Sequence, residues 1–184
     1  HVYTGIAKTV KRALPLKALQ RIRTLNLANR PSLDFARDMF MFSFYTRGMS
    51  FIDMANLKTD DIKYNTLYYR RHKTGQQLQI RWERCMQEIV DKYKYITVAP
   101  FLLPISESPD DPYPRYKCIM SRVNKYLKRV ALLANIDAPL TMYVARHSWA
   151  SVARVAHIPI SIISQGMGHD SELTTQIYLA TINN

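Results

Sequence analysis

Residues 141–179 constrain this chain more than any other part of it. They carry Arg146, His169 and Tyr178, in that order, on a stretch whose apolar pattern predicts three consecutive helices. The guanidinium group of arginine is a planar, always-charged fork that matches the paired oxygens of a phosphate. A phenol held beside it is placed to attack the phosphorus. Tyr178 is therefore a candidate nucleophile, although a tyrosine chosen at random is most often a packing residue.

The charge balance points to a polyanionic partner. The 184 residues include 26 Lys and Arg against 14 Asp and Glu, which gives a formal net charge of +12. Nucleic acid binds such proteins because each neutralised phosphate releases condensed counterions. Charge alone fits a merely soluble basic protein equally well. The choice between this and a nucleic-acid-binding protein therefore depends on the sequence motifs.

Two cysteines, Cys85 and Cys118, lack a His or Cys neighbour at metal-ligand spacing. They support neither a metal site nor a disulfide framework, and reduced thiols fit a bacterial cytoplasm. No apolar run approaches the ~20 residues of a membrane span, and no signal peptide opens the chain. We expect a cytoplasmic protein with no cofactor and no membrane partner.

The predicted elements are mainly helical. An almost wholly apolar segment from Ser32, the expected N-cap, to Tyr45 should form a central buried helix. The pattern then changes to strands at 62–65, 67–72 and 77–80, with turns at Asn65-Thr66 and at 73–76. The fold class is therefore mainly α (α+β) with a small three-stranded antiparallel sheet. One further helix is expected to begin at Pro15. The remaining expected helices span 51–57, 83–97, 115–134, 141 to before Pro159, 160–167 and 171–181.

An ordered set of motifs carries a family resemblance. Arg-His-Ser-Trp-Ala stands at 146–150, Gly-Met-Gly-His at 166–169 and Thr-Thr-Gln-Ile-Tyr at 174–178. Together with Lys-Thr-Gly at 73–75 and the segment 47–57, they resemble the catalytic domain of tyrosine recombinases, the phage-integrase family. In detail they are most like integrases of Bacteroides-type mobile elements. The resemblance implies a catalytic domain at 15–184, preceded at 1–14 by a linker from a separate DNA-binding domain.

The resemblance implies a role for each matched residue. Tyr178 would be the nucleophile, Arg146 would clamp the phosphate, and His169 would donate to the phosphate or shuttle a proton. Lys73, at a strand-to-strand turn, would protonate the departing 5′ oxygen. The structural alternatives are a helix-face ion pair for Arg146, a loop or capping histidine for His169 and a solvated turn lysine for Lys73.

The chain departs from the family pattern at two places. Tyr143 stands where the family has a histidine before the second arginine; its hydroxyl can donate to a phosphate but cannot act as a neutral base near pH 7. The first arginine of the family falls on Ser50, with Arg47 as the nearest guanidinium, so either could fill that role. His147, next to Arg146, is as well explained by a structural role as by a catalytic one.

Further basic residues are expected to contact DNA phosphates, which would position the duplex without reading its sequence. A solvated face is the alternative for those on the 115–134 helix. The expected DNA-binding residues are Lys8, Lys11, Arg12, Arg71, Arg115, Arg122, Lys125 and Arg129.

The resemblance implies a site-specific DNA recombinase or integrase that works through a 3′-phosphotyrosyl intermediate, without metal or ATP. Its partner would be double-stranded DNA, on which the full-length protein would form a homotetramer, with the fragment alone monomeric. Two alternatives remain at this point. One is a DNA-binding regulator derived from a recombinase and disabled at Ser50 and Tyr143, and the other is a type IB topoisomerase-like enzyme.

Overall fold

The structure is a computed structural model that describes residues 13–108 and 115–183. Nearly all of the expected linker, with Lys8, Lys11 and Arg12, lies outside these residues. No helix within the described part is long and apolar enough to cross a membrane. The described elements are eight helices, one short 3-10 turn and three strands, which confirms the mainly helical fold class.

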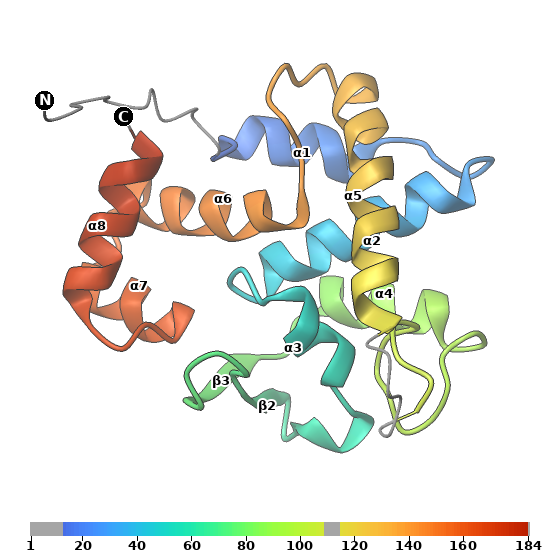
Figure 1. The fold of residues 1–184 in the computed structure, drawn as a ribbon, viewed down its shortest axis with the longest axis horizontal. Helices are drawn as coiled ribbons and strands as arrows, with labels where there is room; N and C mark the ends of the chain where they lie inside the picture. Colours follow the sequence, from blue (N-terminus) through green and yellow to red (C-terminus); the bar gives the residue numbers. More distant parts are fainter. Residues whose placement is uncertain (1–12, 109–114, 184) are drawn as a thin grey trace, which may run out of the picture.

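Helix α2 (Pro31–Tyr45) is the centre of the fold, as its apolar sequence predicts. It is surrounded by α1 (Leu16–Thr24), α4 (Arg84–Tyr93), α5 (Arg115–Leu133) and α6 (Met142–Val155), as Figure 1 shows. Phe40 and Phe42 of α2 are fully buried in the main core. The prediction that Ser32 caps this helix is wrong, since the helix begins at Pro31 and its N-cap is Arg30, two residues before Ser32. Pro31 suits the first helical position because that position needs no N–H donor.

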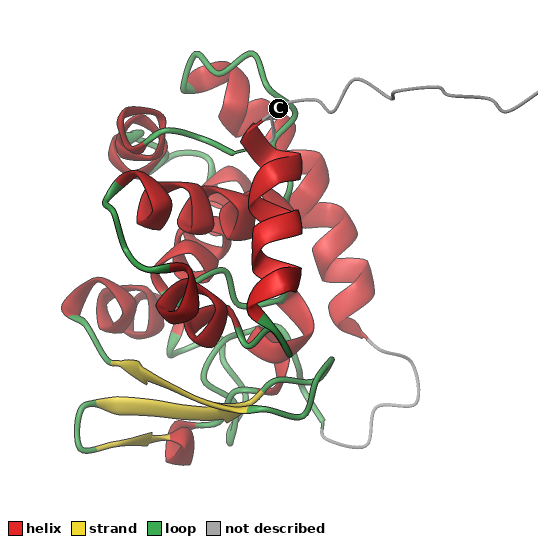
Figure 2. Cartoon of the chain, turned by 90° about the vertical axis from the view of Figure 1, so that its left-hand side faces the viewer, coloured by secondary structure: helices red, strands yellow, loops and turns green. Residues whose placement is uncertain are grey.

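The sheet lies at one end of the helical body (Figure 2). It follows α3 (Phe51–Asn56) and the 3-10 turn Thr59–Asp61, and its strands β1 (Ile62–Lys63), β2 (Thr66–Arg70) and β3 (Gln77–Arg81) are antiparallel in that order. The first hairpin turn falls on Tyr64 and Asn65, one residue earlier than predicted. Both have positive φ angles, 50° and 55°, which two-residue hairpin turns of this hand require.

The last two helices pack separately from the main core. Helices α7 (Ile160–Met167) and α8 (Glu172–Asn183) enclose, with α6, a small apolar cluster of Ala150, Ala153, Ile163, Met167 and Leu179. Tyr178 lies on α8 and packs against this cluster. The helix that carries the predicted nucleophile is therefore held by few apolar side chains.

Candidate active site

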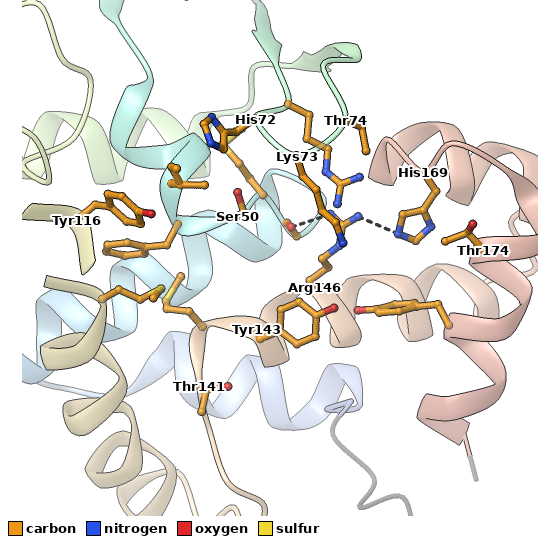
Figure 3. A pocket seen from close by; sticks show the side chains of 18 of the residues that line it. Ser50, His72, Lys73, Thr74, Tyr116, Thr141, Tyr143, Arg146, His169 and Thr174 are labelled. Carbon is orange, nitrogen blue, oxygen red and sulfur yellow. Dashed lines mark hydrogen bonds between the residues drawn. The ribbon is translucent and has the colours of Figure 1, made fainter. Parts of the chain in front are cut away.

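One pocket of about 730 Å³ collects most of the predicted catalytic residues, but neither Arg47 nor His147 lines it. Its wall comes from the start of α3, the loop between β2 and β3, one face of α5, the first half of α6 and the α7–α8 region (Figure 3). Among the residues that line it are Ser50, Lys73, Tyr143, Arg146, His169 and Tyr178. Segments far apart in sequence thus bring a phenol, an imidazole, an ammonium and a guanidinium to one place.

Arg146 is buried, with 7% of its surface exposed, and its guanidinium is fixed by three contacts. Nη1 donates to the carbonyl of Gly48 at 3.0 Å, and Nη2 donates to the carbonyl of Met167 at 2.7 Å. Nη2 also lies 3.0 Å from Nε2 of His169, the contact drawn as a dashed line in Figure 3. Burial and the nearby Arg71 lower the pKa of Arg146. Arg146 has no ion pair with an acidic residue in the described part of the chain, so the helix-face ion pair considered above does not form.

His169 follows the end of α7 and bridges Arg146 to α8. Its Nδ1 lies 2.8 Å from the hydroxyl of Thr175, which is fully buried. Burial, Arg146 and Arg71 lower the pKa of His169 to about 4. The ring is therefore neutral at pH 7. Because arginine can only donate, Nε2 must be the acceptor and Nδ1 carries the proton toward Thr175.

Tyr178 lies among three other rings. Its ring stacks on that of His147 with centroids 5.0 Å apart and an interplanar angle of 14°, and it meets His169 edge-on at 5.6 Å. Tyr143 meets His147 edge-on at 4.6 Å, and its side chain also interacts with that of Tyr178. Burial is the main cause that raises the pKa of Tyr178, and the Tyr143 contact adds to it. The phenol therefore keeps its proton in this state.

The β2–β3 loop brings two cations to the pocket, not one. Lys73 is exposed and lines the pocket, as the sequence predicts for a turn lysine that reaches the site. Arg71, expected only as a general DNA contact, is 9% exposed and lines the same pocket. Its Nη1 donates to the carbonyl of Gly168.

Two glycines leave room for Arg146 and Arg71 to pack closely against the neighbouring backbone. Gly48 has φ 75°, and a Cβ there would lie 2.5 Å from the Cα of Arg146. Gly168 has φ 64° and ends α7, and a Cβ there would lie 3.0 Å from Cδ of Arg71. A side chain at Gly48 would push away the backbone of α6, whereas one at Gly168 would press on the Arg71 side chain; at both positions the positive φ adds strain.

The two candidates for the first-arginine role lie in different places. The Ser50 hydroxyl is at the pocket wall, where it caps α3 and donates to Oδ2 of Asp53 at 2.6 Å. The Arg47 side chain lies outside the pocket lining, beside Gly166 and Trp149: a Cβ on Gly166 would meet Cδ of Arg47 at 3.4 Å.

The predicted DNA-binding residues of α5 are exposed but do not line this pocket. Arg115 and Arg122 line a depression with Phe35, and Arg129 lines another with Pro31. Lys125 is also exposed. The pocket face of α5 carries Tyr116, Met120 and Asn124 instead. The role of the four basic residues Arg115, Arg122, Lys125 and Arg129 in DNA binding stays a prediction.

No group of three His, Cys, Asp or Glu side chains comes together at metal-binding distance within residues 13–108 and 115–183. The described lining of the pocket offers cationic donors, a neutral imidazole and phenols. Such groups suit phosphoryl transfer, in which positioning and electrostatic stabilisation supply most of the rate.

Comparison with known proteins identifies the family of the chain. Residues 16–184 match the model of the phage integrase family. The chain belongs to this family.

Similar solved structures include XerA recombinase, with 18% identity and a TM-score of 0.64 over 93% of this chain. Others are a lambda integrase tetramer bound to a Holliday junction (19% identity, TM-score 0.67, 97% of this chain) and XerH recombinase bound to difH in a pre-cleavage complex (15%, 0.66, 97%). These likenesses establish the shared fold. The chain spans 62%, 51% and 53% of the length of those three chains, respectively.

Proposed function

We propose that the chain is the catalytic part of a site-specific DNA recombinase. The hydroxyl oxygen of Tyr178 attacks the scissile phosphodiester, an Oη–P bond forms, and the bond from phosphorus to the 5′ oxygen breaks. The 5′ oxygen gains a proton, and the 3′ end stays linked to Tyr178. Attack by the 5′ hydroxyl of another strand reverses these bonds and completes the exchange. The phosphotyrosyl bond conserves the phosphodiester energy, so rejoining needs no ATP.

The observation that carries this proposal is the meeting of Tyr178 with Arg146, His169 and Lys73 in one pocket. A pentacoordinate phosphorus carries more negative charge on its non-bridging oxygens than the ground state does, and buried cationic donors stabilise that charge. Lys73, on a solvent-exposed loop at the pocket rim, is free to approach the 5′ oxygen as a general acid.

The nucleophile also has to lose its proton, and two neighbours bear on that loss. The Nε2 atom of neutral His169 is an acceptor, and the phosphate would compete for the Arg146 donor that it now faces. Arg146 itself lowers the pKa of Tyr178, against the effect of burial. We infer that DNA binding frees His169 to take the phenol proton directly or through water.

The proposed partner is double-stranded DNA, and the proposed working assembly is a homotetramer. The matched lambda integrase structure is described as a tetramer bound to a Holliday junction. In this chain, apolar side chains on α6, α7 and α8 are exposed and available for contact with another copy: Val155, Ile162, Leu173 and Ile177. We propose that the chain alone is monomeric and assembles on DNA, which light scattering with and without DNA would test.

We further propose that the chain comes from an integrase of a Bacteroides-type mobile element, acting in the bacterial cytoplasm. The segments 47–57 and 143–150 support this subgroup. The test is whether the protein joins the two ends of the element that carries its gene, detected by amplification across the circular junction.

A nicked suicide substrate tests the reaction itself. DNA that flanks the element is labelled and nicked beside the cleavage position, so that the released 5′ fragment diffuses away and the adduct accumulates. The wild-type protein should give a covalent adduct that survives denaturing gel electrophoresis. Tyr178→Phe should give none, and Tyr126→Phe on the far face of α5 should behave as wild type.

DNA binding without any adduct from the wild-type protein would instead favour a regulator derived from a recombinase. Relaxation of supercoiled DNA without site preference would favour the topoisomerase-like alternative.

A further inference from the structure

We propose that Arg71 binds the scissile phosphate opposite Arg146, as the second catalytic guanidinium of the pocket. This inference rests on the proposed function and assigns a reacting-centre contact to a residue that the sequence suggests only as a general DNA contact.

The burial of Arg71 requires a reason. Arginine is almost never fully buried unless its charge is paired, because desolvation of a guanidinium is costly. Arg71 is 9% exposed, yet within the described residues it makes no ion pair with an acidic side chain. The nearby Asp53 receives its hydrogen bonds elsewhere, from the His72 backbone N–H at 2.8 Å and from the Ser50 hydroxyl at 2.6 Å.

A second like charge lies beside it. Arg71 is the largest charge effect on Arg146, whose pKa it lowers, and it also lowers the pKa of His169. Two buried cations that repel each other are unfavourable in the free protein, and an anion between them removes that cost. The pair is therefore arranged for a negatively charged ligand.

The protein holds both guanidinium groups at the same place without neutralising them. Arg146 donates to the carbonyl of Met167, the last residue of α7, and Arg71 donates to the carbonyl of Gly168, the next residue. The carboxyl end of a helix carries partial negative charge, which favours cations there. One helix end thus aligns two arginines that come from different elements, while their formal charges remain for a ligand.

Arg71 shares its pocket with the predicted catalytic groups. Arg71, Lys73, Arg146, His169 and Tyr178 all line the same 730 Å³ pocket. Guanidinium groups from two sides can donate to both non-bridging oxygens of one phosphate, since each carries several N–H groups in a planar fork. Lys73 is then left for the 5′ oxygen.

The other candidates for a second donor are less well placed. Arg47 lies beside Gly166 and Trp149, outside the lining of the pocket. The Ser50 hydroxyl donates to Asp53. Arg70, adjacent to Arg71, is exposed on the other face of the strand and donates to the carbonyl of Gly75 at 3.1 Å. Arg70 is therefore a matched control, with the same charge one residue away.

A purely structural role is the competing explanation, because Arg71 anchors the loop that carries His169. The two explanations differ in what they predict when the charge of the phosphate is removed. A methylphosphonate at the scissile position has one fewer charged non-bridging oxygen. A guanidinium that neutralises this oxygen matters less on that substrate, whereas a structural anchor matters equally on both.

The experiment measures single-turnover formation of the Tyr178–DNA adduct on nicked duplexes that carry either a phosphodiester or a methylphosphonate at the cleaved position. Arg71→Gln should slow the phosphodiester reaction by ~100-fold or more, the range seen when one transition-state donor is lost. On the methylphosphonate, Arg71→Gln and the wild type should differ by less than ~10-fold. Arg70→Gln should match the wild type on both substrates, and Arg71→Lys should recover part of the phosphodiester rate.

Titration with inorganic phosphate separates this inference from the reaction that it rests on. Calorimetry should show weaker phosphate binding for Arg71→Gln than for Arg70→Gln. Equal loss by Arg71→Gln on both DNA substrates, or an adduct rate like that of the wild type, would overturn the role of Arg71. If neither the wild type nor any variant forms an adduct, the proposed function is refuted instead. Arg71 then has no catalytic role, whatever the phosphate titration gives.

Discussion

Nη2 of Arg146 and Nε2 of His169 lie 3.0 Å apart, and the arginine is the donor. The contact fixes the neutral tautomer of His169 and directs its Nδ1 proton to Thr175 on α8, at 2.8 Å. The guanidinium group that Arg146 carries on α6 is thereby connected through one imidazole to the helix that carries Tyr178. Protonation of His169 at Nε2 removes the acceptor for Arg146, whereas Nδ1 can still donate to Thr175.

The stability of the protein should therefore fall in mildly acidic solution through His169. Its pKa is about 4 in the folded protein, against 6.5 ordinarily. As pH falls from about 6.5 toward 4, the unfolded chain takes up a proton that the folded chain does not, so the free energy of unfolding decreases. Urea unfolding at pH 7 and pH 5 should show a loss in the wild type that His169→Gln lacks. The exposed His157→Gln should behave as wild type, and an equal loss in all three would contradict the assignment.

Replacement of Gly48 should damage the site more than replacement of another glycine with the same backbone angle. Gly48 and Gly75 have φ angles of 75° and 71°, but a Cβ meets the backbone of Arg146 at 2.5 Å in the first and nothing within 4 Å in the second. Gly75→Ala should cost about 1–2 kcal/mol of unfolding free energy from the left-handed backbone alone. Gly48→Ala should cost about 1–3 kcal/mol more from overpacking and should abolish adduct formation. If urea unfolding shows the same loss of stability for Gly48→Ala and Gly75→Ala, then α6 moves aside for the added methyl group at little cost.

Much of the fold follows from sequence periodicity. The apolar run of α2 and the alternation across β2 and β3 predict a central helix and an antiparallel sheet, and both are present. The errors lie at element ends. Ser32 is a good capping residue by type, but Pro31 begins the helix because it tolerates that position. The hairpin turn shifts to Tyr64, although an aromatic residue rarely adopts positive φ.

The site was predictable to the extent that motifs carry it. Arg146, His169, Tyr178 and Lys73 stand in ordered motifs, and the structure brings them to one pocket. The placement of Arg71 was not predicted, because it depends on the docking of the β2–β3 loop against Gly168. A signal was present nonetheless: Leu67 and Tyr69 are buried, so alternation points Arg71 inward and Arg70 outward. The pattern was hidden because the third inward position, 71, holds an arginine and not an apolar residue.

The buried Asp38 should be one of the costliest acidic side chains to remove. It is 5% exposed and accepts from Arg37 Nε at 2.5 Å, Lys92 Nζ at 2.6 Å and the Tyr93 hydroxyl at 2.7 Å, which joins α2 to α4. Asp38→Ala leaves the Tyr93 hydroxyl without its acceptor and leaves Arg37 and Lys92 paired with Asp34 alone, and it should lower the unfolding free energy by about 3 kcal/mol. Glu88→Ala removes an exposed ion pair with Arg84 and should cost less than about 1 kcal/mol. Similar costs for the two in urea titration would show that the Asp38 network is solvated.

His147 should act on Tyr178 as a flat support. The two rings stack with centroids 5.0 Å apart, and Tyr143 braces the imidazole edge-on at 4.6 Å. An aromatic pair of this kind is worth about 0.5–1.5 kcal/mol, so His147→Ala should slow adduct formation by roughly 2- to 10-fold through looser placement of the phenol. His147→Phe keeps a flat ring and should retain most of the wild-type rate, with DNA affinity unchanged in both variants by fluorescence anisotropy. If His147→Phe is as slow as His147→Ala, the ring nitrogens themselves take part, and the catalytic interpretation of His147 replaces the structural one.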